Sequence, residues 1–415
     1  MRRTRRWALA LCALVALGLG IAACGSSSSS SSSPSSGSSG SSGSSASNGK
    51  PILIGSAIDF SALMAPTDDP ALYGAQIEAA KVNAAGGVDG HQIKFSIANT
   101  QLKPDQTRAS ALNLVGKGAN VLWVTCDVDF STPSIEVGLT SKRLTIAPCI
   151  GTDQMGPKRF GPAGKLAFSY GNVAQDEGAA DAQIAIKQGW KTADVVTDKQ
   201  IVYSQNVCSA FANKFKSLGG QVVGTYSWTQ GDHTVANVAS KVNSSKADVI
   251  QVCTTAAPDI STLLSDVRSA KNTTPILAPW SLDGTYWMPK DPKISTNVWT
   301  DSYASIYGDD PDPRVRAMIA QLKAEGHPPT TGGFVTGAAA IDGIVAAVKQ
   351  SNGSLDGPTL AGIMEGFKAL PTLSGTVTFS PALHTVFGRE YRVLEVTNGQ
   401  GHYKYTIKAG GLAPL

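Results

Sequence analysis

The sequence contains few of the residues, and none of several spacings, on which catalytic and metal sites depend. Its five histidines are scattered and show no H-E-x-x-H spacing, so a zinc site is not indicated. A G-x-S-x-G motif, a phosphate-binding P-loop and a G-x-G-x-x-G motif after the first expected strand are also missing. Asp127 and Asp129 could act as paired acids, but two positions apart in a loop they have no evident orienting partner. We therefore expect neither enzymatic activity nor a cofactor.

A basic surface is also missing. The formal net charge is +4, and four of the arginines lie within the first six residues, so the rest of the chain is nearly neutral. Nucleic-acid binding and attraction to an anionic surface require a concentrated basic patch. We expect no nucleic-acid partner.

The N-terminus combines these arginines with an apolar run from Trp7 to Ala23. This pattern predicts an export signal over residues 1–23, whereas the alternative, a transmembrane anchor, needs roughly 20 apolar residues. Residues 25–49 are almost entirely serine and glycine and cannot bury apolar surface, so we expect a disordered tether. Such a tether spans roughly 25 to 30 Å on average.

The sequence "IAAC", which ends at Cys24, resembles a bacterial lipobox. The resemblance implies that Cys24 carries a lipid and becomes the mature N-terminus. Residues 24–50 would then be a lipidated anchor and tether, and the protein would be extracytoplasmic and held at a membrane.

Four cysteines remain in the folded part of the chain, Cys126, Cys149, Cys208 and Cys253. An even number in an exported protein favours disulfides, although four buried free thiols are the alternative. Cys126 and Cys149 end consecutive expected strands, and Cys208 begins a helix near the end of the strand that carries Cys253. We predict the pairs 126–149 and 208–253, which require Cα atoms within about 7 Å.

From Pro51 onward, short apolar runs alternate with helix-period segments, which indicates parallel α/β architecture. About 365 residues are too many for one ordinary core and suit two lobes. Expected strands of the first series are 51–58, 92–98, 119–125 and 143–148, with helices at 72–90 and 103–118. The second series has helices at 174–189, 205–220, 234–245 and 258–270 and strands at 192–197, 221–228, 247–254 and 274–280. Further helices are expected at 312–326, 333–350 and 357–370, and a β-rich end at 375–407.

Two local signals mark helix ends in the first series. Gly86 and Gly87 can turn the backbone left-handed and should stop the first helix. Pro104 and Asp105 suit the first turn of the second helix.

The segments "PILIGSAIDFS", "NAAGGVDGHQIKF", "VLWVTCDVDFSTPS" and "SGTVTFSP" occur in the order found in the periplasmic leucine/isoleucine/valine-binding protein family, which the mature chain resembles. The resemblance implies a type I fold: two doubly wound parallel-sheet lobes joined by a three-strand hinge, with a ligand between them. Lobe one would comprise residues 51–170 and 304–372. Lobe two would comprise residues 171–303 and 373–415.

The resemblance also implies which loops meet the ligand. In the family, the loops after two strands of lobe one supply hydroxyl and N–H groups to the ligand's α-carboxylate, and a carboxylate in lobe two holds the ammonium. The implied ligand-binding residues here are Asp127, Ser131, Cys149, Gly151, Thr152, Tyr203, Thr254 and Trp280.

These residues also have simpler interpretations. Asp127 or Asp129 could cap a helix that starts near Pro133. Thr254 could cap the following helix. Tyr203 could be an exposed loop residue, and Trp280 could be ordinary lobe packing.

The two loops of lobe one depart from the family pattern. The first offers Asp127 and Asp129, and the second has Cys149, Ile150 and Gly151 where small and hydroxyl residues are expected. An unpaired aspartate beside a ligand carboxylate would be unfavourable by several kcal/mol in a poorly solvated cleft. This argues against recognition of a plain α-amino acid.

The function implied by the resemblance is the solute-binding subunit of an ABC importer, which captures a small polar solute such as an amino acid or amide and delivers it to a membrane permease. A ligand-sensing receptor of the same fold is the alternative, because function depends on the site rather than on the fold. We expect Asp127 to face the ligand and Tyr203 to cover it.

Overall fold

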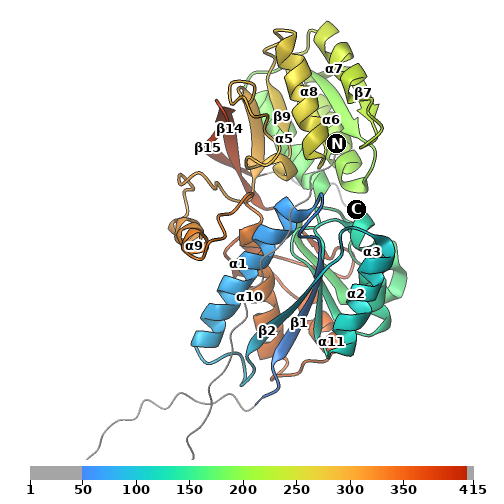
Figure 1. Cartoon of the computed structure of the whole chain (residues 1–415), viewed down its shortest axis with the longest axis vertical. Helices are drawn as coiled ribbons and strands as arrows, with labels where there is room; N and C mark the ends of the chain where they lie inside the picture. Colours follow the sequence, from blue (N-terminus) through green and yellow to red (C-terminus); the bar gives the residue numbers. More distant parts are fainter. Residues whose placement is uncertain (1–48, 409–415) are drawn as a thin grey trace, which may run out of the picture. The chain divides into compact units, whose positions relative to one another are not determined.

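The computed structural model describes residues 49–408. The expected signal segment, Cys24 and most of the tether lie outside this range, as do residues 409–415. The described residues all belong to one compact unit, Ser45–Leu415, which contains two large sheets (Figure 1). None of the helices within residues 49–408 combines the length and apolarity that a membrane crossing needs.

The first large sheet has six parallel strands. They are β1 (Ile52–Ile58), β2 (Ile93–Asn99), β3 (Val121–Val124), β4 (Leu144–Ala147), β5 (Ala167–Asn172) and β13 (Thr385–Val386), in the spatial order β13-β5-β4-β3-β1-β2. The covering helices are α1 (Ala65–Ala84), α2 (Pro104–Gly116), α3 (Val128–Thr140), α10 (Phe334–Gln350) and α11 (Gly357–Glu365) (Figure 1). Every residue of β3 and β4 is buried, as expected for parallel strands with helices on both faces.

The second large sheet has seven strands in the order β15-β14-β10-β9-β8-β6-β7. Its strands are β6 (Thr192–Asp198), β7 (Gln221–Trp228), β8 (Val249–Cys253), β9 (Ile276–Ala278), β10 (Val298–Ser302), β14 (Glu390–Thr397) and β15 (Gln400–Lys408). Its helices are α5 (Ala174–Lys187), α6 (Val202–Ser217), α7 (Val235–Ser244) and α8 (Ala257–Ser269). Strands β6 to β10 are parallel, whereas the terminal hairpin of β14 and β15 joins β10 in antiparallel orientation.

The remaining elements connect these layers. They are α4 (Pro157–Phe160), the 3-10 turns η1 (Gly161–Leu166) and η2 (Trp280–Leu282), α9 (Pro313–Ala324) and the small hairpin of β11 (Leu370–Thr372) and β12 (Gly375–Val377).

Most of the expected elements are present, and the prediction of α/β architecture with two wound sheets is confirmed. The first helix ends at Ala84, and Gly86 has a φ of 103°, so this stop signal works as expected. Helix α2 begins at Pro104 with Asp105 in its first turn. Strands β5 and β10 were not among the expected strands.

The start of α3 corrects the prediction of a helix beginning near Pro133. The helix begins at Val128, because the Asp127 side chain caps it, and Pro133 lies inside it. Proline is tolerated in the first turn of a helix, where its missing N–H has no partner to lose. Pro133 lies beyond that turn, so it does not mark the start of α3.

The strand pairing also refines the expected lobe boundaries. Residues 385–386 lie in the range expected for lobe two, but as β13 they pair with β5 of the first sheet. Val377, Phe379 and Val386 are buried in the core of the first sheet, which holds this segment there. The chain therefore returns to the second sheet between Val386 and Glu390 rather than near residue 373, while the other lobe boundaries stay predictions.

Candidate functional site

Three of the candidate residues follow strands at which the order of a sheet reverses. In the first sheet, β1 and β3 are neighbours, and the following strands extend away from them in opposite directions. In the second sheet, β6 and β8 have the same relationship. Ligands of open parallel sheets bind beyond the carboxyl ends of strands at such switch points. Asp127 follows β3, Tyr203 follows β6 and Thr254 follows β8.

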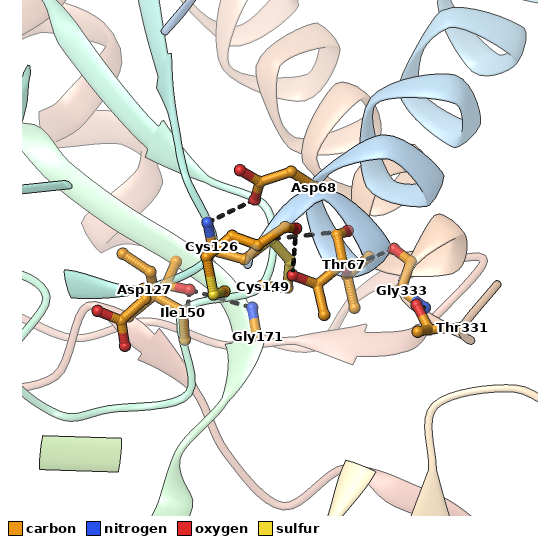
Figure 2. Close-up of a disulfide and its surroundings, with 12 residues drawn as sticks. Thr67, Asp68, Cys126, Asp127, Cys149, Ile150, Gly171, Thr331 and Gly333 are labelled. Carbon is orange, nitrogen blue, oxygen red and sulfur yellow. Dashed lines mark hydrogen bonds between the residues drawn. A yellow bond between two sulfur atoms is a disulfide. The ribbon is translucent and has the colours of Figure 1, made fainter. Parts of the chain in front are cut away.

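A disulfide joins the loop after β3, at the first switch point, to the loop after the neighbouring strand β4. Cys126 follows β3 and Cys149 follows β4, and the bridged residues have Cα atoms 4.8 Å apart. The backbone N–H of Cys126 donates to Oδ1 of the buried Asp68 at 2.7 Å, which fixes the β3 loop to the start of α1 (Figure 2). Asp127 and Ile150 lie on one side of this bridge, and Thr331 and Gly333 lie on the other (Figure 2).

The second predicted disulfide is also present. Cys208 of α6 pairs with Cys253 of β8, with Cα atoms 5.8 Å apart. Both pairings predicted from the positions of the cysteines are therefore confirmed in the structure. Cys149 is fully buried within its bridge, and its predicted contact with a ligand stays a prediction.

Asp127 is the N-cap of α3. Its Oδ1 accepts the backbone N–H groups of Asp129 at 2.9 Å and Phe130 at 3.0 Å. Burial raises the pKa of Asp127 to about 7, against the lowering effect of the N–H donated by Phe130. Ser131 is also engaged within this helix start, because its hydroxyl donates to the Asp127 carbonyl. The capping interpretation of Asp127 is therefore correct, and direct ligand contact by either residue stays a prediction.

Asp129 has a different role, because it joins elements of the two large sheets. Its Oδ1 accepts from Arg159 at 2.7 Å, and its Oδ2 accepts the backbone N–H of Val202 at 2.9 Å. Val202 is the first residue of α6, so an acidic residue in the first turn of α3 holds the N-terminus of a second-sheet helix. A carboxylate is favoured at such a position by the helix dipole.

The residues that the second sheet and its helices contribute to the site form its second wall, opposite the loops after β3 and β4. This wall centres on Glu177, which the sequence analysis did not identify. Its Oε1 accepts from the Tyr203 hydroxyl at 2.9 Å and from the backbone N–H of Trp280 at 2.8 Å. Glu177 lies in the first turn of α5, Tyr203 in the first turn of α6 and Trp280 at the start of η2. One carboxylate thus fixes two predicted aromatic residues from separate elements.

Tyr203 and Trp280 both reach residues that belong with the first sheet. A side chain on Gly151 would place its Cβ 2.8 Å from Cε2 of Tyr203, so only glycine fits beneath this ring. The corresponding position on Gly333 is 3.9 Å from Cζ3 of Trp280. The structure therefore brings Gly151, Tyr203 and Trp280 together around Glu177.

Two other predicted residues are buried in hydrogen-bond networks. The Thr254 hydroxyl donates to Asp198 Oδ2 at 2.9 Å and accepts the N–H of Ala256 at 3.0 Å, which supports the turn before α8. The Thr152 hydroxyl accepts from the N–H of Gln154 at 3.2 Å. Contact of these residues with a ligand stays a prediction.

Several more buried acids surround Glu177. Burial raises the pKa of Glu177 well above its usual range, and the charge of Asp181 adds to the rise. Burial likewise raises the pKa of Asp301, with Asp181 and Glu177 contributing next. Burial raises the pKa of Asp283 to about 7, although Asp283 accepts from Ser302 and from the N–H of Gly332. The region therefore concentrates carboxyl groups whose charged forms are disfavoured in the folded protein.

A second network joins the segments that cross between the sheets. The hydroxyl of Tyr303 accepts the backbone N–H of Asn172 at 2.9 Å, and the Asn172 amide donates to the Tyr391 hydroxyl at 2.5 Å. The guanidinium of Arg389 lies 4.7 Å from the centre of the Tyr303 ring and donates to the Tyr170 carbonyl. These contacts link the ends of β5 and β10 with the start of β14. Rotation of one sheet against the other would therefore have to bend or break them.

Among the residues described, 49–408, no group of three or more His, Cys, Asp or Glu side chains is arranged to hold a metal ion.

The sequence offered only a weak signal for the role of Glu177. It is an acid in the first turn of a helix that follows a crossing between the sheets, but acids are favoured at helix starts in general. Its partners lie 26 and 103 residues away in the sequence, so no local pattern reveals the contact.

The chain is similar to proteins of known sequence and of known structure. An amino acid binding protein of Pseudomonas aeruginosa is 26% identical over 200 residues, which are 48% of this chain and 52% of that protein. The chain thus spans about half the length of the curated relative it matches.

Solved structures of similar fold cover most of the chain. The isoleucine complex of the substrate-binding protein LivJ from Streptococcus pneumoniae has a TM-score of 0.75 at 17% identity and covers 86% of this chain and 99% of its own. The leucine-binding protein LivK from Thermotoga maritima has a TM-score of 0.73 at 19% identity, with 86% and 98% covered. A solute-binding protein from R. palustris in complex with benzoate has a TM-score of 0.70 at 18% identity, with 86% and 96% covered.

These likenesses confirm the type I fold that the sequence resemblance implied. The family model for periplasmic binding proteins matches residues 51–401, which is most of the chain. The protein therefore belongs to the periplasmic binding protein family.

Proposed function

We propose that the protein is the extracytoplasmic solute-binding subunit of an ABC importer. It captures a small polar solute between the loops of its two wound sheets and delivers it to a membrane permease. The observation that carries this proposal is the meeting of Tyr203 and Trp280, both held by Glu177, with Gly151 and Gly333. No catalytic step is part of the proposal.

Capture requires only a difference in affinity between two arrangements of the sheets. A solute that contacts both walls stabilises the closed arrangement by the extra contacts it makes there. The hydrogen bond from Val202 to Asp129 and the contact of Tyr203 with Gly151 are interactions of such a closed arrangement. The permease then recognises the closed form.

The lipid anchor is the finer part of the proposal. Cys24 lies outside the described residues, and its lipidation rests on the sequence "IAAC" and the Ser/Gly segment that follows. A lipid on Cys24 would keep the binding protein beside its permease.

Solute capture is tested by thermal unfolding of the purified protein in the presence of amino acids, amides, amines, polyamines and aromatic acids. A solute at about 100 times its dissociation constant adds roughly 2.7 kcal/mol to the free energy of unfolding. The expected result is a concentration-dependent rise in Tm for one chemical class. Cells that lack the gene should then lose uptake of that solute; retained uptake would count against the importer role.

A further inference from the structure

Two neighbouring cations of the short helix α4 each bind an acid that also contacts the start of a second-sheet helix. The first cation, Arg159, donates to Oδ1 of Asp129 at 2.7 Å and to Oε1 of Gln154 at 3.0 Å. The second oxygen of Asp129 accepts the backbone N–H of Val202, the first residue of α6, at 2.9 Å. Both carboxylate oxygens of Asp129 are therefore occupied by groups of the chain itself.

The second cation, Lys158, repeats this arrangement with Asp153 in the loop after β4. Lys158 donates to Oδ2 of Asp153, and the same oxygen accepts the side-chain amide of Gln175 at 3.1 Å. Gln175 lies in the first turn of α5, directly after the chain leaves β5. Each of the two cations thus holds, through an acid on the first-sheet side, the start of one helix of the second sheet.

Helices α5 and α6 pack tightly together, so the two contacts act on one unit. Gly178 of α5 lies so close to Val207 of α6 that a side chain on the glycine would collide with the Val207 carbonyl. The same pair of helices borders the candidate site, because Tyr203 of α6 lies against Gly151. Movement of α6 away from the loops after β3 and β4 would break its bond to Asp129.

The two ion pairs are partly exposed to solvent. The side chains of Arg159 and Asp129 are 26% and 29% exposed, and that of Lys158 is 51% exposed. Ion pairs at such exposure shift an equilibrium by about fivefold at most, because water and salt screen them. Contacts of this strength can favour one arrangement of the two sheets and still be broken when a solute is released.

We propose that Arg159, with Lys158 beside it, is a positioning residue for solute capture. It holds Asp129 against the start of α6 and so stabilises the closed arrangement; we call the pairs Arg159–Asp129 and Lys158–Asp153 the latch. This inference rests on the proposed function, since it states what sets the affinity of the same site. All partners of the latch belong to the chain, so it favours closure before a solute binds. Affinity then rises with the closed fraction.

The test is the double variant Lys158→Gln/Arg159→Gln, which removes both charges from exposed positions of a four-residue helix and should leave the fold intact. With the solute found by the thermal screen, calorimetry should show an affinity lower by roughly threefold to tenfold. Stopped-flow measurements should show faster dissociation. Added salt should weaken binding by the parent more than by the variant, because it screens these pairs only where they exist. Arg159→Lys, which keeps the charge, should retain most of the affinity.

The matched control is Arg108→Gln. Arg108 pairs with Glu136 at a similar exposure, but this pair joins α2 and α3 and does not reach the second sheet. Its loss should leave affinity and dissociation rate unchanged. An equal loss of affinity in Arg108→Gln and in the double variant would reveal a general effect of charge and reject the latch.

X-ray scattering in solution gives a measurement that needs no solute. Without solute, the radius of gyration of the double variant should exceed that of the parent, and saturating solute should make the two equal. Equal affinity and dissociation rate of variant and parent would reject the latch and leave solute capture standing. If the screen finds no solute for the parent, capture itself fails, and equal radii of parent and variant would separately reject the latch.

Discussion

One edge of the Tyr203 ring lies so close to Gly151 that a Cβ at residue 151 would be 2.8 Å from Cε2 and 2.9 Å from Cδ2. This contact joins the loop after β4 to the first turn of α6. Because the Tyr203 hydroxyl is bonded to Glu177, the ring cannot move away without losing that bond. The closeness of the two loops therefore depends on the absence of a side chain at Gly151.

Gly151→Ala should weaken solute binding by interfering with this contact. Overpacking of a tight site typically costs about 1 to 3 kcal/mol, and each 1.4 kcal/mol is about tenfold in affinity. We expect a loss of roughly tenfold or more by calorimetry with the identified solute. The control is Gly116→Ala, where the added methyl group meets open space. Equal affinity of Gly151→Ala and the parent would show that the contact plays no part in binding.

Asp127→Ala should destabilise the protein through loss of the α3 cap. Removal of an aspartate N-cap costs about 0.5 to 2 kcal/mol, and asparagine is a comparable cap. Urea unfolding should therefore show a lower free energy for Asp127→Ala and a nearly unchanged value for Asp127→Asn. If Asp127→Asn is stable but binds the solute tenfold to a hundredfold more weakly, Asp127 also contacts the ligand.

Stability should fall as the pH rises from about 4 to 8. Burial raises the folded-state pKa of Asp127 and Asp283 from 3.8 to about 7 in each case. The folded protein therefore binds these protons more tightly than the unfolded chain, and the resulting stability is present below pH 3.8 and lost as the pH approaches 7. Each unit of pKa difference corresponds to about 1.4 kcal/mol.

The pH dependence can be measured by urea unfolding at a series of pH values. The free energy of unfolding should be higher at pH 5 than at pH 8, and Asp283→Asn should reduce the difference. Carboxyl groups near the surface with lowered pKa, such as Asp312 and Asp356, act in the opposite direction only near and below pH 4. Constant stability between pH 5 and pH 8 would contradict the assigned burial of these acids.

Removal of the two disulfides should have different effects on binding. The bridges separate residues by 23 and 45 positions, so loss of unfolded-chain restraint costs about 3 to 4 kcal/mol for each. Cys126→Ser/Cys149→Ser should also weaken solute binding, because this bridge joins the loops after β3 and β4, which carry Asp127 and Gly151. Cys208→Ser/Cys253→Ser should lower Tm with little change in affinity. A peptide map under non-reducing conditions that shows free thiols would contradict both pairings.

Cys24→Ser should prevent lipid attachment. The variant is expected in the soluble fraction or as the unprocessed precursor, whereas the parent stays with the membrane. Metabolic labelling with a fatty acid provides the measurement, and Cys12→Ser, within the expected signal segment, is the matched control. Undiminished labelling of Cys24→Ser would refute the anchor.

Local patterns in the sequence were sufficient for much of the architecture. The alternation of buried runs with helix-period segments predicted the two wound sheets, and Gly86 and Pro104 marked helix boundaries because their backbone preferences act within one turn. The positions of the cysteines were enough to predict both disulfides. Cys126 and Cys149 follow neighbouring parallel strands, whose ends lie together, and Cys208 lies in a helix expected near the end of the strand that carries Cys253.

Only the tertiary structure decided which polar residues form the two walls. Asp127 was recognised as either a cap or a ligand contact, and the hydrogen bonds to Asp129 and Phe130 assign the cap. Glu177 escaped detection because its partners are remote in sequence, and an acid in a first helical turn is common. The crossing after β13 was likewise misplaced, because the burial of Val386 in the first sheet depends on strands more than two hundred residues earlier. Secondary structure follows from short-range sterics and periodicity, whereas a binding site follows from which distant segments the folded core brings into contact.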